Sequence, residues 1–182
     1  FMPPYVRSFI PGPGITVAPN SSLVIEFSEA MSESTINGTN LKLFSITNGV
    51  ATEVTTGVSV SLDSNERRFV TVTHNALPAG EYEGRVLGGA ANATGVAMRP
   101  PTQSSEIAFR SSFTVAGSSD SASPTVFPQL ANNATAVPVN NTFQFGFNEQ
   151  LLISTLSTSN ITLSRGGTTV AITTKYDPGK NT

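Results

Sequence analysis

Apolar and polar residues alternate along much of this chain, and the alternation predicts β-strands. In Leu23–Phe27, the residues at positions 23, 25 and 27 lie on one side and Glu26 lies on the other. Residues 143–147 repeat the pattern, with three phenylalanines expected to face inward. Because successive side chains of a strand point to opposite faces, both segments are predicted to be half-buried strands that pack against a second sheet. The same pattern predicts strands over residues 40–46, 56–62, 69–73, 81–87, 107–115, 160–164 and 170–176.

Turn-forming residues separate the predicted strands. Asn48 and Gly49 lie between two β-rich runs and favour the positive φ angles of a hairpin turn. Residues 165–168 (RGGT) occupy the corresponding place later in the chain. No segment shows sustained helical periodicity, and residues 28–36 are expected to form a single helical turn at most. Short strands separated by turns at this spacing predict an all-β fold, and specifically a β-sandwich.

The chain repeats itself at an offset of 120 residues. A repeat of this length has the size of a whole domain and is too long for one turn of a solenoid. We therefore predict a module over residues 1–116, a polar linker over 117–123 and a second, shorter module over 124–182. Identical pairs include Pro4/Pro124, Val6/Val126, Val17/Val137, Asn20/Asn140, Phe27/Phe147, Glu29/Glu149, Ser34/Ser154, Thr35/Thr155, Asn40/Asn160 and Leu43/Leu163.

Composition narrows the classes of function. Only 12% of the residues are charged, and the net charge is −2 without a run of Lys or Arg. This balance argues against a nucleic-acid-binding surface or a polybasic membrane patch. The absence of cysteine excludes disulfides, zinc–thiolate sites and thiol catalysis. A cysteine-free β-protein rich in Ser, Thr and Asn is common among prokaryotic surface proteins, although a cytosolic protein without cysteine has the same composition.

A series of landmarks follows in a fixed order along the first module. They are residues 17–20 (VAPN), 27–31 (FSEAM), 34–36 (STI), 40–43 (NLKL), 77–82 (LPAGEY) and 92–95 (NATG). In this order they resemble the bacterial Ig-like domains that occur as tandem repeats in surface-layer and other large prokaryotic surface proteins. The resemblance covers the first module and the first half of the second, and departs from the family at Gln150-Leu151 and in the long segment 90–105. It implies tandem Ig-like β-sandwiches, the second one truncated.

Two explanations fit a second module of about half length. The sequence is a piece of a longer array, or a strand from a neighbouring chain completes the sandwich, because an unfinished sandwich exposes sheet edges and half of its core. We prefer the first explanation and leave the second open.

The resemblance and the composition together suggest a structural role. We expect a non-catalytic spacer module of an extracellular cell-surface assembly, such as a surface layer, stalk or filament. Its expected partners are neighbouring copies in a homo-oligomeric assembly or other surface proteins. The alternative is an accessory module of a secreted enzyme or adhesin that presents a separate functional head. An Ig-like sandwich hosts many roles, so the fold alone does not choose between them.

Candidate catalytic residues are few, and we expect no enzyme. His74 is the only histidine and is predicted to lie exposed in a loop, with no G-x-S-x-G nucleophile motif in the chain to pair with it. Glu26, Glu29 and Glu33 are close in sequence. Glu29 recurs as Glu149 in the second copy, however, and recurrence in a structural repeat favours a bond to the local backbone over acid–base chemistry.

One group of oxygen-bearing residues could form either a calcium site or a plain solvated turn. Residues 63–66 (DSNE) and Asp120 could supply the oxygen ligands that calcium prefers. The chain lacks a D-x-[DN]-x-[DN]-G loop and has sparse carboxylates, so a solvated turn is the favoured interpretation. We expect no bound cofactor.

Six N-x-S/T sequences are candidate N-glycosylation sites. Ser and Thr are so frequent here that several such sequences would arise by chance, and the pattern alone does not establish modification. The candidate asparagines are Asn20, Asn37, Asn92, Asn133, Asn140 and Asn160.

Overall fold

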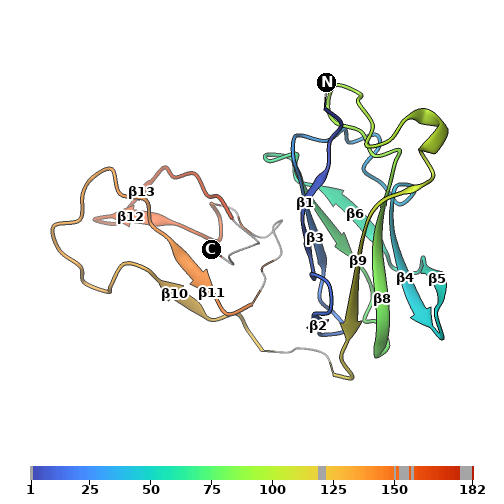
Figure 1. The fold of residues 1–182 in the computed structure, drawn as a ribbon. Coiled ribbons are helices and arrows are strands. Elements are labelled where there is room, and N and C mark those ends of the chain that lie inside the picture. The colour runs from blue at the N-terminus through green and yellow to red at the C-terminus, as the bar shows by residue number, and fades with distance from the viewer. Residues whose placement is uncertain (1, 119–121, 150, 152–155, 157, 177–181) are drawn as a thin grey trace. The chain divides into compact units, whose positions relative to one another are not determined.

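A computed structural model describes residues 2–118, 122–149, 151, 156, 158–176 and 182. Its elements are β-strands apart from one short 3-10 helix, Pro101–Gln103 (Figure 1). The predicted all-β class is therefore confirmed. The chain divides into two compact units, Phe1–Ser121 and Ala122–Thr182, and each is described by itself.

The first unit is built from two sheets. One sheet has the order β1-β3-β7-β6 and the other the order β2-β9-β8-β4-β5. Neighbouring strands are antiparallel except β2 and β9, which pair in parallel. The first sheet contains β1 (Val6–Ile10), β3 (Leu23–Phe27), β7 (Phe69–Thr73) and β6 (Ser59–Leu62). The second contains β2 (Thr16–Val17), β9 (Ile107–Val115), β8 (Gly80–Leu87), β4 (Leu41–Thr47) and β5 (Val50–Val54).

Local sequence accounts for several strand ends in this unit. Asn48 and Gly49 have φ angles of 51° and 77° and close the predicted hairpin between β4 and β5, with Thr47 opposite Val50. The strand predicted from residue 56 starts only at Ser59, because Gly57 adopts a positive φ of 72° within a turn. Ser32 O accepts both the Thr35 and the Ile36 N–H at 3.1 Å, which is the single helical turn expected there.

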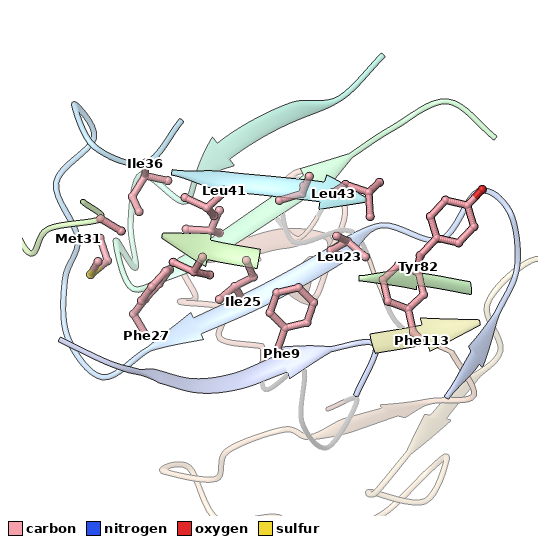
Figure 2. Close-up of a cluster of buried hydrophobic side chains, with 14 of the residues drawn as sticks. Phe9, Leu23, Ile25, Phe27, Met31, Ile36, Leu41, Leu43, Tyr82 and Phe113 are labelled. Carbon is pink, nitrogen blue, oxygen red and sulfur yellow. The ribbon is translucent and has the colours of Figure 1, made fainter. Parts of the chain in front are cut away.

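The core lies between the two sheets (Figure 2). Leu23, Ile25 and Phe27 point inward from β3 as the alternation predicts, and each is at most 1% exposed. They pack against apolar residues of the opposite sheet, including Leu43 and Phe113. Burying one such side chain contributes roughly 1.5–3 kcal/mol, so this face of β3 is a principal source of the unit's stability.

A glycine of β8 makes room for an aromatic ring of the opposite sheet. Phe9 of β1 stacks on Phe109 of β9 with 5.7 Å between ring centroids. A Cβ atom added at Gly84 would overlap Cζ of the Phe9 ring. The absence of a side chain at position 84 therefore lets the ring enter the core.

Tyr82 of β8 anchors the loop that precedes its strand. Its hydroxyl donates to Pro78 O at 2.9 Å, and its ring stacks on Phe113 with 6.0 Å between centroids. This arrangement matches the tyrosine corner of Ig-like sandwiches. Burial raises the pKa of Tyr82 above its ordinary value of 10.0, because the charged phenolate is poorly solvated there.

The second unit repeats details of the first. It contains β10 (Val126–Pro128) paired with β11 (Phe145–Phe147), and β12 (Leu163–Arg165) paired with β13 (Thr168–Val170). Gly166 and Gly167, with φ angles of 55° and 82°, form the turn of the second hairpin as Asn48 and Gly49 do in the first unit. The strands predicted over 160–164 and 170–176 are wrong in extent, because this hairpin is centred on residues 166–167.

The inward orientation predicted for Phe143, Phe145 and Phe147 is wrong for the first two in this unit, whereas Phe147 is half-buried. Phe143 is 45% exposed and Phe145 is 36% exposed. Their first-unit counterparts, Leu23 and Ile25, are covered by a second sheet. The described residues of the second unit form two separate two-stranded sheets, which leave this face open.

We expect Gly84→Ala to lower the free energy of unfolding by about 1–3 kcal/mol, because the added methyl group overpacks the core against Phe9. Urea denaturation followed by circular dichroism measures the change. Gly38→Ala is the matched control, since nothing lies within 4 Å of the position its Cβ would take. Equal midpoints for the two variants would contradict this role of Gly84.

We expect the stability of the protein to fall as the pH rises above about 10, and Tyr82→Phe to reduce that fall. The unfolded state ionises near the ordinary tyrosine pKa of about 10, whereas the folded state holds the Tyr82 proton to higher pH, so high pH favours unfolding. Melting temperatures between about pH 8 and 11 test the slope. Tyr5→Phe is the control because Tyr5 is 53% exposed, and an identical slope in both variants would contradict the assignment to Tyr82.

Candidate functional site

The most highly connected polar cluster of the first unit surrounds Asn92. This residue is only 3% exposed and forms an isolated antiparallel bridge with Met31. Its side-chain Nδ2 donates to Glu29 Oε2 at 2.9 Å. Its Oδ1 accepts the backbone N–H groups of Thr94 at 3.1 Å and Val96 at 2.8 Å, and the Thr94 hydroxyl at 2.9 Å. The cluster joins the loop after β3 to the loop after β8.

Thr35 also joins these two loops. Its hydroxyl oxygen lies 3.1 Å from Ser32 O and 3.2 Å from Ala91 O, and either carbonyl can accept its proton. The same hydroxyl accepts the Ala91 N–H at 3.0 Å. Ser32 N–H donates to Ala91 O at 2.9 Å. The bond to the local backbone predicted for Glu29 is therefore wrong, because the partner of its carboxylate is a side chain 63 residues away.

The candidate glycosylation site at Asn92 is corrected by this geometry. Its amide nitrogen is buried and bonded to Glu29, so a glycosyltransferase has no access to it in the folded protein. Asn37 is half-buried, with Nδ2 donating to Ser34 O and Oδ1 accepting the Thr39 N–H, both at 2.9 Å. Exposed positions are occupied by the other four candidates, namely Asn20, Asn133, Asn140 and Asn160.

The structure does not bring the candidate catalytic groups together. His74 follows β7, as expected, but it is half-buried rather than exposed, with Nδ1 2.8 Å from Asn75 O. Glu26 forms an ion pair with Arg7 at 3.2 Å and lies 3.8 Å from Arg68. Glu29 binds Asn92, and Glu33 is exposed. These three carboxylates therefore have separate surroundings.

The candidate calcium ligands of the 63–66 turn are used within the turn. Asp63 Oδ1 accepts the N–H groups of Asn65 at 2.9 Å and Glu66 at 2.6 Å. Glu66 Oε2 forms an ion pair with Arg68 at 3.2 Å. Asp120 lies outside the described residues. Within the described ranges, no group of three or more His, Cys, Asp or Glu side chains has the arrangement of a metal site.

Sequence reasoning missed a charged cluster on the sheet of β8 and β9. Glu83 is 7% exposed and accepts hydrogen bonds from Arg85 Nε and from Ser112 Oγ. Arg110 Nη1 lies 3.9 Å from Glu83 Oε2, and the guanidinium of Arg85 lies 3.9 Å from the centroid of the Phe44 ring. The charged residues at alternate positions 81, 83 and 85 could have indicated such a cluster. Their partners, however, depend on the register between strands.

An open hollow of about 550 Å³ is present in the second unit. Its apolar wall includes Pro128, Leu130, Phe143 and Phe145, and Asn132 and Asn133 add polar atoms.

No described helix has the length and apolar character needed to cross a bilayer.

Comparisons with known proteins identify a family for the first unit. Residues 2–115 match the family model described as bacterial Ig-like domain. No curated protein matches the chain.

Several solved structures are similar to part of the chain, including the following three. CopC from Methylosinus trichosporium OB3b is 12% identical, with 64% of this chain and 97% of that chain covered and a TM-score of 0.44. PcoC, a methionine-rich copper resistance protein from Escherichia coli, is 19% identical, with coverages of 62% and 98% and a TM-score of 0.46. The surface layer protein SbsC, domains 1–6, is 16% identical, with coverages of 71% and 15% and a TM-score of 0.43.

We expect Asn92→Ala to lower the free energy of unfolding by about 1–3 kcal/mol, because it removes a buried side chain and leaves the Thr94 and Val96 N–H groups and the Glu29 carboxylate without their partner. Urea denaturation measures the change. Asn140→Ala, at an exposed asparagine of the second unit, is the control. If the two variants lose the same stability, the Asn92 cluster does not join the loops energetically.

Proposed function

The chain belongs to the bacterial Ig-like domain family, and on this premise we propose that it is a non-catalytic structural module of an extracellular cell-surface assembly. In this role the sandwich spaces and links its neighbours, which are further copies of the chain or other surface proteins. Surface layers, stalks and filaments are assemblies of this kind.

The observation that carries the proposal is the use of the first unit's polar side chains. Glu29 and Asn92 bind one another, Thr35 binds the backbone of a distant loop, and Ser111 Oγ donates to Pro11 O at 3.0 Å. Each of these groups fixes one segment of the sandwich to another. An enzyme site requires nucleophiles, acids or bases that converge on space for a substrate. These residues instead form hydrogen bonds within the sandwich.

The exposed chemistry supports a role in contacts with other proteins. The low charged content and the absence of a basic run leave the protein without an electrostatic field that would concentrate nucleic acid or anionic lipid. Edge strands remain available in both sheets of the first unit, where β5 and β6 each have one neighbour. Such edges and the loops between strands are the surfaces through which sandwiches contact one another.

Surface labelling of intact source cells, followed by cross-linking, tests the proposal. We expect a membrane-impermeant amine reagent to modify the exposed Lys175 before lysis, and cross-linked peptides to join this chain to further copies or to other surface proteins. Labelling that appears only after lysis would contradict the location. Cross-links confined to a single catalytic or adhesive partner would replace the structural role by that of an accessory module.

A further inference from the structure

We propose that two copies of this chain join through β5. The free edges of the two β5 strands pair antiparallel, so that the five-stranded sheets of two first units become one continuous sheet. The inference rests on the proposed structural role, because it names a second copy of the chain as the partner. Strands of the same sheet come before and after β5 in the sequence, so the site belongs wholly to the first unit.

The backbone of β5 offers hydrogen-bonding groups along a free edge. This strand has β4 as its only neighbour among the described strands and lies at the end of its sheet (Figure 1). Thr47 and Val50 flank the two-residue turn and pair with one another. Such a pair exchanges backbone hydrogen bonds, and further pairs of this kind recur at every second position along the hairpin. The N–H and C=O groups of Ala51 and Glu53, which lie between these pairs, therefore point to the free edge.

The other edge strands of the first unit are less suited to strand addition. A bulge between Val6 and Ser8 interrupts β1, and β2 has only two residues. The apolar residues of β6, Val60 and Leu62, pack against the core. β5 contains no proline or lysine, its register with β4 is continuous, and its Val50 is 65% exposed. Among the described edge strands of this unit, β5 alone presents an exposed large apolar side chain and lacks the features that protect an edge.

The residue pattern of β5 (VATEV) is self-complementary, as a two-fold interface between identical chains requires. In an antiparallel pair centred on Thr52, Val50 of each copy lies opposite Val54 of the other. The exposed Val50 thereby gains an apolar cross-strand neighbour. Ala51 lies opposite Glu53 in the same register, and each such pair exchanges two backbone hydrogen bonds because both residues direct these groups to the edge.

Charge favours this register over the adjacent ones. Glu53 is the only charged residue of β5, and Lys42 Nζ donates to its two carboxylate oxygens at 2.8 and 2.9 Å. A register centred on Glu53 would place the carboxylates of the two copies directly opposite one another, which is unfavourable. A register centred on Ala51 would place Glu53 opposite Gly49, whose φ of 77° belongs to the turn and not to a strand. The register centred on Thr52 avoids both conflicts.

Disulfide trapping of the 182-residue chain tests the proposal. The chain has no cysteine, so Thr52→Cys introduces a single thiol. In the proposed pair, residue 52 lies opposite its own copy in a non-hydrogen-bonded pair, where Cα atoms are about 4.5 Å apart and a disulfide can form. In a glutathione redox buffer, we expect Thr52→Cys to form a disulfide-linked dimer about tenfold faster than the control, because pairing holds the two thiols together. Non-reducing gel electrophoresis measures the rate. The control is Ser61→Cys, at an exposed position of the edge strand β6.

A second variant tests the backbone pairing itself. Ala51→Pro, introduced into the Thr52→Cys chain, removes an N–H group that faces the free edge and leaves the hydrogen bonds between β5 and β4 in place. We expect the rate of dimer formation to fall to that of Ser61→Cys. Circular dichroism of the variant checks that the sandwich remains folded.

Two outcomes would overturn the proposal. Equal rates for Thr52→Cys and Ser61→Cys would show that the β5 edges meet no more often than random collision allows, which leaves this edge to solvent or to a different protein. An unchanged rate after Ala51→Pro in the folded chain would show that the copies meet without pairing their strands. Neither result bears on the cell-surface location, which the labelling of intact cells tests separately, and labelling only after lysis would leave the trapped dimer unaffected.

Discussion

The first unit depends on the contact between its two sheets, because each sheet has an apolar face that only the other covers. Leu23, Ile25 and Phe27 supply one side of this contact from β3, and β4, β8 and β9 supply the other. Other features of the unit adjust to this contact. Gly84 leaves space for Phe9, and the Asn92 and Thr35 bonds fasten loops over the end of the core. In the second unit no sheet of described strands covers Phe143 and Phe145 in this way, and both side chains are exposed.

The comparison of the two units distinguishes features that depend on nearby sequence from features that depend on distant strands. The hairpin turns at residues 48–49 and 166–167 and the β1–β3 type pairing are present in both. These features need only short-range sequence: a positive-φ pair in the turn, and a side-chain oxygen that accepts the N–H of the neighbouring strand. Among the described residues, Leu23 and Ile25 are fully buried whereas their counterparts Phe143 and Phe145 are exposed, because the burial of Leu23 and Ile25 depends on strands that come much later in the chain.

The same distinction explains what the sequence could predict. Alternation located β3, β4, β7, β8 and β9, and the series of landmarks between residues 17 and 95 predicted the family whose model matches residues 2–115. The strands β1 and β2 were not predicted, because residues 10–14 (IPGPG) interrupt their short apolar pattern. Neither the Glu29–Asn92 bond nor the surroundings of Glu83 could be predicted, since both depend on which distant residues the sheet register places together. His74 was assigned to the correct loop, but its burial depends on neighbours that alternation does not specify.

The parallel pairing of β2 with β9 has a mechanical consequence. Thr114 N–H donates to Ile15 O at 2.9 Å and Ala116 N–H donates to Val17 O at 2.8 Å. When the chain is pulled from both sides of the first unit, the force that reaches β2 acts at its N-terminal end and the force on β9 acts at its C-terminal end. In parallel strands these ends lie at opposite ends of the pair, so the two bonds are loaded together in shear. A module joined in this way resists extension by sharing the load across bonds instead of opening them one after another.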